Sequence, residues 1–310
     1  MWIAELKGAE TAADRIDAAR ALAKFGGTKV VDRELQRALV GDSFWGVQAA
    51  AAASLGKIRS PYARDALIKA LGAIESHHAR RAVVKALGSF RRDEKAASAL
   101  AEVAAGDPSY RVEAEALCAL GKIRSPGAAE ILIAALDRES FFDIIRQQAF
   151  AGLGELGDPE QIDHMLAGTN YGRPSFGRRA AARAMATIAR GRGDHIARTV
   201  RERLEELLDD PDFRVQAAAI SSLGLLGDAA ATTALQRAAE RDLDGRLRRR
   251  SLEVIRDLAE GRAHSDANAA LLEQVEALER RVVELGTRVA KLEATSGGVR
   301  KGTSTSGSGN

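Results

Sequence analysis

Apolar residues recur along most of this chain with the spacing of an amphipathic helix, and the pattern itself repeats every 32 to 35 residues. Each repeat can be aligned on a leucine or isoleucine that follows a small or β-branched residue by four positions. These anchors are Leu22, Leu55, Leu87, Leu120, Leu153, Ile188, Leu223 and Leu258. Apolar positions three and four residues apart form one face of a helix. We therefore expect each anchor to lie on the buried face of a helix.

Each repeat contains a further helical stripe upstream, such as Leu67, Ile68 and Leu71. Three dipeptides read as a helix N-cap followed by proline at the first helical position: Ser60-Pro61, Ser125-Pro126 and Asp158-Pro159. Two Asp-Pro pairs interrupt repeats in the middle: Asp107-Pro108 and Asp210-Pro211. Four glycines stand where second helices are expected to end: Gly56, Gly121, Gly157 and Gly227. Each repeat is therefore predicted to be helix–turn–helix.

Self-similarity at this period is the signature of a solenoid, in which each helix pair buries its apolar face against its neighbours. We predict an all-α protein, an α-solenoid of about eight repeats over residues 1–262. At about 8–10 Å between packed helices, eight repeats would form a curved rod on the order of 70–80 Å long.

A heptad pattern replaces this period from Asn268 onward. Leucines recur every seven residues, and valines stand four positions after the first three: Leu271, Leu278, Leu285 and Leu292, with Val275, Val282 and Val289. Val at a and Leu at d is typical of parallel two-stranded coiled coils. We predict a coiled-coil helix over 266–294 and a homodimer through 268–293, with a capping helix on the last repeat as the alternative. The tail 295–310, rich in Gly, Ser and Thr, is predicted to be disordered.

The composition narrows the class of protein. Of 310 residues, 45% are hydrophobic, 29% are charged and 4% are aromatic, which favours a packed core of small residues. A single cysteine excludes a disulfide framework and a Cys-based zinc site. The chain contains no run of 18 apolar residues, so we expect no membrane-spanning helix. Its N-terminus lacks the pattern of a secretory signal. We expect a cytoplasmic protein.

The usual catalytic motifs are absent. There is no HExxH and no GxSxG elbow. Gly152 and Gly154 stand within a predicted helix end and not in the strand-to-helix turn of a phosphate-binding glycine loop. His77 and His78 are adjacent, so on a helix they point about 100° apart and do not chelate a metal in the manner of HExxH. Cys118 stands among apolar residues and is predicted to be a packed, inert thiol. We expect no catalytic residue, no metal and no cofactor.

Arginine recurs nine positions before four anchors, and an Asp precedes it by four positions in two of these repeats: Asp107 before Arg111, and Asp210 before Arg214. We interpret these as a ladder that ties the turn of one repeat to the next. The alternative is a row of guanidinium groups that receives acidic ligands.

Aromatic residues gather where second helices are expected to begin: Trp45, Tyr110 and Phe213, with Phe44, Phe142 and Phe176 nearby. They could hold the loop onto the helix start as a hydrophobic staple, or they could grip a peptide.

The segment least like a repeat is the enlarged turn Gly168–Gly177, which carries Tyr171 and Phe176. Loops on a rigid scaffold often bind ligands. Residues 173–203 contain nine Arg and two acidic residues, whereas residues 130–163 contain eight acidic residues and two Arg. The candidate binding residues are Tyr171, Arg173, Phe176, Arg178, Arg179 and Arg183. Because the acidic block interrupts the basic surface, we expect a protein or peptide partner and not a nucleic acid.

The helix–turn–helix pattern resembles HEAT repeats, including the HEAT-like units of phycobilin lyases. The segments Gly41–Val47 and Gly106–Val112, the GKIRSP turns and the heptads are similar to the C-terminal helical-repeat region of aminopeptidase-N zinc enzymes. That family binds zinc through HExxH and the substrate amine through Gly-x-Met-x-Asn. Neither motif is present, so the resemblance transfers no catalytic residue.

Together these patterns favour a non-catalytic scaffold that binds a protein or peptide and self-associates through its C-terminal helix. The resemblances imply two alternatives. One is an accessory domain of a zinc aminopeptidase, and the other is a HEAT-like enzyme of the bilin lyase or DNA glycosylase type.

Overall fold

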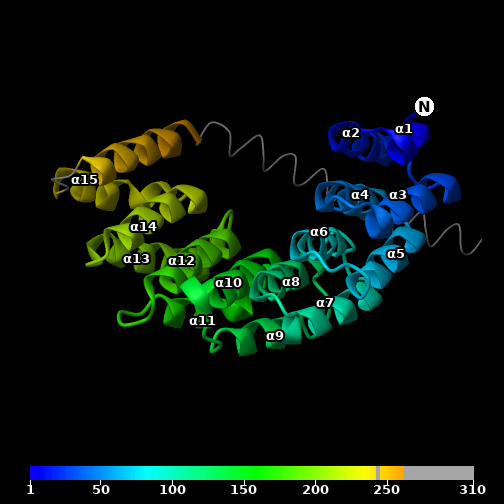
Figure 1. The fold of residues 1–310 in the computed structure, drawn as a ribbon. Helices are drawn as coiled ribbons and strands as arrows, with labels where there is room; N and C mark the ends of the chain where they lie inside the picture. The colour runs from blue at the N-terminus through cyan, green and yellow to red at the C-terminus, as the bar shows by residue number, and fades with distance from the viewer. Residues whose placement is uncertain (242–244, 262–310) are drawn as a thin grey trace, which may run out of the picture. The chain divides into compact units, whose positions relative to one another are not determined.

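The structure is a computed structural model that describes residues 1–241 and 245–261, and every regular element in these residues is helical (Figure 1). The helices alternate between a first and a second helix of each repeat. The first helices are α1 (Trp2–Gly8), α3 (Lys29–Gly41), α5 (Pro61–Leu71), α7 (Glu94–Gly106), α9 (Ala128–Ala135), α11 (Ile162–Gly168), α13 (His195–Glu206) and α15 (Thr232–Arg241). The second helices are α2 (Ala12–Leu22), α4 (Trp45–Ile58), α6 (His77–Leu87), α8 (Tyr110–Ile123), α10 (Ile144–Leu156), α12 (Ser175–Ala189), α14 (Phe213–Leu226) and residues 246–261.

Short 3₁₀ helices extend several of these elements. They are η1 (Ala23–Phe25), η2 (Phe141–Asp143), η3 (Pro159–Gln161), η4 (Leu207–Asp209) and η5 (Ala229–Ala231). The predicted all-α solenoid fold is confirmed.

The chain divides into two compact units, Met1–Ile255 and Arg256–Asn310. The predicted coiled-coil or capping helix 266–294 and the tail 295–310 lie outside the described residues, so both remain sequence predictions.

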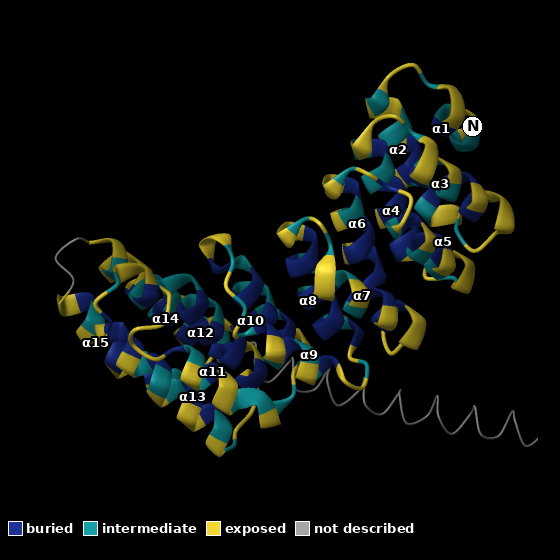
Figure 2. Cartoon of the chain, turned by 60° about the horizontal axis from the view of Figure 1, so that its bottom comes forward, coloured by how far each residue is buried: buried dark blue, intermediate teal, exposed yellow. Residues whose placement is uncertain are grey.

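The second helices pack on one another in chain order from α2 to α14, and the first helices form a neighbouring row (Figure 1). All eight anchors are buried, as are all eight small or β-branched residues four positions earlier. Figure 2 shows the buried residues on the helix faces that meet in this unit, with exposed residues at helix ends and turns. The repeat pattern therefore marks the seams between helices.

Glycine brings the second helices close together. A Cβ atom built on Gly121 of α8 would lie 2.0 Å from the carbonyl oxygen of Gly152 in α10. A Cβ on Gly56 of α4 would lie 2.9 Å from the Cβ of Ala86 in α6. The prediction that Gly56 and Gly121 end their helices is therefore wrong. Both lie inside a helix, where the missing side chain permits close approach of the neighbour.

The helix ends use several kinds of cap. Gly157 and Gly227 follow α10 and α14 in the left-handed conformation, as predicted, whereas arginine takes this place after α4 and α8. Ser60 caps α5 by accepting a hydrogen bond from the N–H of Ala63. The Ser125-Pro126 prediction is wrong, because the N-cap residue of α9 is Gly127, with a φ of +79°.

Arginine–aspartate pairs tie the middle turns of successive repeats together. Arg80 donates from Nε and Nη2 to the two carboxylate oxygens of Asp107, each at 2.9 Å, and from Nη1 to the carbonyls of Ile74 and Glu75. Arg15 makes the same set of bonds to Asp42 and to the carbonyls of Ala9 and Glu10. The fork of five N–H donors on arginine suits this arrangement.

A ladder therefore exists, but its arginines differ from the predicted ones. Asp107 pairs with Arg80 instead of Arg111, and Asp210 pairs with Arg178 instead of Arg214. In both cases the arginine belongs to the preceding repeat. Asp107 also accepts a hydrogen bond from the N–H of Ser109, so it joins the turn to that repeat.

The close approach at Gly121 gives a first test. We expect Gly121→Ala to lower the free energy of unfolding by about 3 kcal/mol, because the new methyl group meets backbone that cannot move without shifting α10. The matched control is Gly106→Ala, at the end of α7, where a Cβ meets nothing within 4 Å. This variant should be unchanged or gain up to about 1 kcal/mol from helix propensity. Urea unfolding of both variants measures the difference, and equal stability would contradict the close approach.

The Arg15–Asp42 pair gives a pH-dependent test. Burial raises the pKa of the Asp42 carboxyl, but hydrogen bonds from Arg15 and from the N–H of Phe44 outweigh it, so the pKa lies below its ordinary value. A carboxyl with a depressed pKa stabilises the fold above its unfolded pKa, and this stabilisation is lost as the pH falls through the folded value. Asp42→Asn should therefore cost about 2 kcal/mol at pH 7, and the difference from the unsubstituted protein should shrink below about pH 4.

Urea unfolding at pH 7 and at acid pH measures this difference. Asp17→Asn, at an exposed carboxylate on α2, is the control and should change stability little at either pH. A deficit for Asp42→Asn that is the same at both pH values would show that the carboxylate charge contributes nothing.

Candidate protein-interaction surfaces

The enlarged turn predicted from the sequence joins α11 to α12. Tyr171 at its tip is 81% exposed, and Arg173 is also exposed. The base of the turn is held from two sides. Arg178 donates from Nε to the carbonyl of Thr169 at 3.3 Å, and Arg203 donates from Nε to the Thr169 hydroxyl at 2.9 Å. The tip is therefore presented to solvent on a fixed base.

Arg178 differs from the other candidate residues in this region. Only 4% of it is exposed, and it forms a buried ion pair with Asp210. Its guanidinium carbon also lies 5.9 Å from the centroid of the Tyr171 ring. The structure therefore makes Arg178 part of the inter-repeat ladder, and its charge is not available at the surface.

The remaining candidates lie on one face of α12. Phe176, Arg179 and Arg183 are three and four residues apart, which places them one above the other. Phe176 and Arg179 are half-buried, and Arg183 is exposed. The guanidinium carbon of Arg179 lies 5.4 Å from the centroid of the Phe176 ring.

Aromatic side chains gather where the second helices begin, at the edge of the unit that also carries the enlarged turn. We call this set the aromatic edge: Phe44, Trp45, Tyr110, Phe141, Phe142, Tyr171, Phe176 and Phe213. Phe176 is half-buried, and the other seven are between 37% and 81% exposed. The sequence prediction placed most of them correctly at helix starts.

Two rings of the aromatic edge contact a ring of the following repeat. The Trp45 ring stacks on His78 of α6 with centroids 4.8 Å apart, and Phe142 meets Phe176 edge-on at 5.6 Å. Phe44 also lies over Gly46, where a Cβ would stand 2.5 Å from its ring. This contact holds the loop onto the first turn of α4, as a staple would, while the outer faces of the rings stay in solvent.

Arginines lie over several of these rings. The guanidinium carbon of Arg214 is 5.1 Å from the Phe213 centroid, and that of Arg111 is 6.0 Å from the Tyr110 centroid. Cation–π contacts of this kind are worth about 0.5–1 kcal/mol at exposed sites. The two arginines that the sequence predicted for the ladder, Arg111 and Arg214, thus lie over rings of the aromatic edge.

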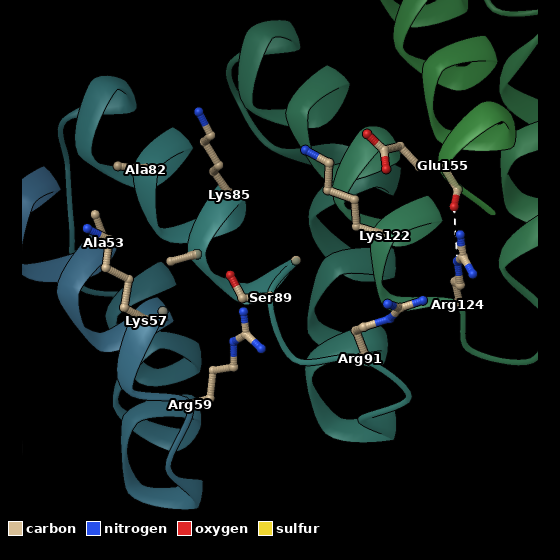
Figure 3. Close-up of a pocket in the computed structure, with 13 residues that line it drawn as sticks. Ala53, Lys57, Arg59, Ala82, Lys85, Ser89, Arg91, Lys122, Arg124 and Glu155 are labelled. Carbon is tan, nitrogen blue, oxygen red and sulfur yellow. Dashed lines mark hydrogen bonds between the residues drawn. The ribbon is translucent and has the colours of Figure 1, made fainter. Parts of the chain in front are cut away.

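A groove lies at the other ends of the second helices, between α4, α6 and α8 (Figure 3). We call it the basic groove. It encloses about 540 Å³ and is lined by six basic side chains: Lys57, Arg59, Lys85, Arg91, Lys122 and Arg124. Glu155 is its one acidic lining residue. Sequence inspection missed this groove, although the repeated GKIRSP segment supplies four of its cations.

The side chains able to bind a metal or act as a nucleophile are dispersed in the described residues. Within residues 1–241 and 245–261, no three His, Cys, Asp or Glu side chains gather as metal ligands would. Burial raises the pKa of the Cys118 thiol, which disfavours the reactive thiolate. His77 and His78 lie exposed at the start of α6. Across the same residues, none of the helices has the length and apolarity that crossing a bilayer demands.

Solved structures match the chain at low identity. One chain in the structure of the CpcE–CpcF complex of phycocyanin lyase from Nostoc sp. PCC7120 is 22% identical, with a TM-score of 0.48 over 75% of this chain and 96% of that chain. Human deoxyhypusine hydroxylase with glycerol is 17% identical, with a TM-score of 0.35 over 73% and 94%. An engineered protein is 18% identical, with a TM-score of 0.34 over 90% and 93%. Likeness at this level transfers no activity.

Comparison by sequence gives a firmer result. No curated protein matches the chain, and the matches found lend no support to the aminopeptidase-N resemblance. A family model of HEAT repeats matches residues 33–117, 98–186 and 178–256, and these matches together cover more than half of the sequence. The chain therefore belongs to the HEAT-repeat family.

Proposed function

We propose that this chain is a non-catalytic scaffold that binds a segment of another protein along its aromatic edge. The observation that carries the proposal is where the aromatic residues lie. Of the 13 in the chain, only Phe90 and Phe150 are buried, whereas eight form the aromatic edge. Large apolar side chains ordinarily contribute to the core. A row of them in solvent is typical of an interaction surface.

The chemistry of the edge suits recognition of a protein. Interfaces are enriched in Tyr, Trp, Phe and Arg, and such residues supply most of the binding energy. The aromatic edge supplies the Tyr, Trp and Phe side chains, and Arg111, Arg179 and Arg214 lie over its rings. The rings offer apolar contact, and the arginines can pair with carboxylates or carbonyls of the partner.

The enlarged turn extends this surface. Tyr171 projects from a base fixed by Arg178 and Arg203, so it loses little conformational freedom when a partner binds. Beside it, Phe176, Arg179 and Arg183 present one face of α12. We propose these residues, together with Arg173, as the part of the edge that selects the partner.

Self-association is a separate part of the proposal. The heptads over 268–293 support a parallel homodimer, which would place two aromatic edges in one particle. Two linked binding surfaces raise the avidity for a partner that carries two matching segments.

A matched pair of double variants tests the edge. Tyr110→Ala/Phe213→Ala removes one Tyr and one Phe from it, and Phe25→Ala/Tyr62→Ala removes the same residue types, similarly exposed, from elsewhere. We would select peptides from a random display library on the unsubstituted protein and measure their affinities for each variant. The edge variant should bind about tenfold more weakly or worse, since each aromatic anchor contributes more than 1 kcal/mol.

The control variant should bind within twofold of the unsubstituted protein. Selected peptides that bind the edge variant as tightly as the control variant would overturn the assignment of this surface. Thermal melting of both variants confirms that the fold is intact.

Sedimentation of the full chain and of a 1–261 truncation tests self-association. The full chain should sediment with about twice its monomer mass and the truncation as a monomer, because only the former holds the heptads. Monomeric masses for both would refute the dimer.

A further inference from the structure

We propose that the basic groove is a second binding site and that its occupant is an extended acidic segment of a protein. It lies at the C-terminal ends of α4, α6 and α8, whereas the aromatic edge includes the N-terminal ends of α4 and α8. At 1.5 Å per residue, the 14 residues of α4 or α8 separate the two surfaces by about 20 Å. The two proposals therefore stand or fall independently.

Six cations from three consecutive repeats line the groove. Figure 3 shows Lys57, Lys85 and Lys122 projecting to the same side, with Arg59, Arg91 and Arg124 along the other side. A concave surface lined by one sign of charge focuses the field and raises the local concentration of ligands of opposite charge.

These cations are not neutralised within the part of the chain that the structure describes. None of the six forms an ion pair with a carboxylate there. Arg124 only donates from Nε to the backbone carbonyl of Glu155, at 3.0 Å. By contrast, Arg15, Arg80 and Arg178 each hold an aspartate. The pairing capacity of the groove is therefore open to a ligand.

The backbone at two of these arginines carries a cost that the fold does not require. Arg59 and Arg124 take left-handed φ angles of 54° and 56° just after α4 and α8. At the same position after α10 and α14, four residues past the anchor, the chain uses Gly157 and Gly227. Glycine adopts this conformation without strain, whereas a side chain does not. At both positions a glycine would adopt the backbone conformation with less strain. The arginines at these positions place their charge in the groove.

The spacing of the cations identifies the shape of the occupant. Packed helices are about 8–10 Å apart, so the lysines of successive repeats are separated by about that distance. A polyproline II segment has three residues per turn and a rise of about 3.1 Å per residue, so every third side chain recurs on one face at about 9 Å. A segment with an acidic residue at every third position therefore matches the groove repeat for repeat.

A protein segment fits better than a nucleic acid. The cations cover three repeats, and the groove ends at Glu155. The chain that follows α10 carries Asp158, Glu160 and Asp163, and these carboxylates would repel a continuing phosphate backbone. An acidic segment of about seven to nine residues spans the three helices and ends before these carboxylates.

The test uses fluorescence anisotropy of a labelled peptide of three Glu-Pro-Ala triplets on the full chain. Lys57→Ala/Lys85→Ala/Lys122→Ala should weaken binding about tenfold, since three charge pairs are lost and each exposed pair changes affinity severalfold at most. Lys24→Ala/Lys69→Ala/Lys95→Ala removes three exposed lysines outside the groove and should bind within twofold of the unsubstituted protein. Equal affinities for the two triple variants would overturn the proposal.

Other probes decide the identity of the occupant. A peptide of Gln-Pro-Ala triplets should not bind, and a peptide with its three Glu adjacent should bind severalfold more weakly than the spaced one. A 12-nucleotide oligo-dT that binds more tightly than the Glu-Pro-Ala peptide, with the same loss in the groove variant, would show that the occupant is nucleic acid and would overturn the acidic-segment assignment.

Arg59→Gly separates binding from folding. The glycine relieves the left-handed backbone, so the melting temperature should not fall, while peptide affinity should drop severalfold. A lower melting temperature with unchanged affinity would assign Arg59 to the helix end and remove it from the site.

Discussion

The fold depends on how closely successive second helices approach one another. Where α8 meets α10, the Cα of Gly121 stands so near the backbone of Gly152 that no side chain fits between them. Alanine and glycine at the seams make this approach possible, and the buried anchors fill the space beside it. A core built from small residues has little room for rings, because a ring would force neighbouring helices apart. The aromatic residues are accordingly found at the helix starts, where their outer faces meet solvent and where binding surfaces can form.

Much of the fold could be predicted from the sequence because the same apolar pattern recurs in every repeat. The anchors and the small residues before them are set by the helix repeat alone, so their burial could be predicted by counting. The arginine–aspartate ladder could not, because Asp107 is closer in sequence to Arg111 than to Arg80, and only the packing of one repeat on the next shows which guanidinium reaches it. The same holds for Arg178, which lies in an arginine-rich stretch yet is buried against Asp210. Charge counts along a sequence do not distinguish a surface cation from one inside a seam.

The basic groove was missed for a related reason. Its cations come in pairs from three successive repeats and lie together only when α4, α6 and α8 stack. The visible signal was the repeated GKIRSP segment, which looked like turn chemistry because it contains glycine and proline. In the structure its glycine serves helix packing, its serine caps the next helix in the first copy only, and its lysine and arginine line the groove.

The arginine–aspartate pairs that share one bonding pattern recur after two repeats, not after each repeat. Arg15 binds Asp42 and Arg80 binds Asp107 with the same atoms, and the two arginines are 65 residues apart, as are the two copies of GKIRSP. The interchangeable module in this part of the molecule is thus two repeats long. Excising 65 residues would bring equivalent partners together at the junction, whereas excising a single repeat would leave an arginine facing a turn that lacks its aspartate. Length variation among relatives built in this way should therefore proceed in steps of four helices.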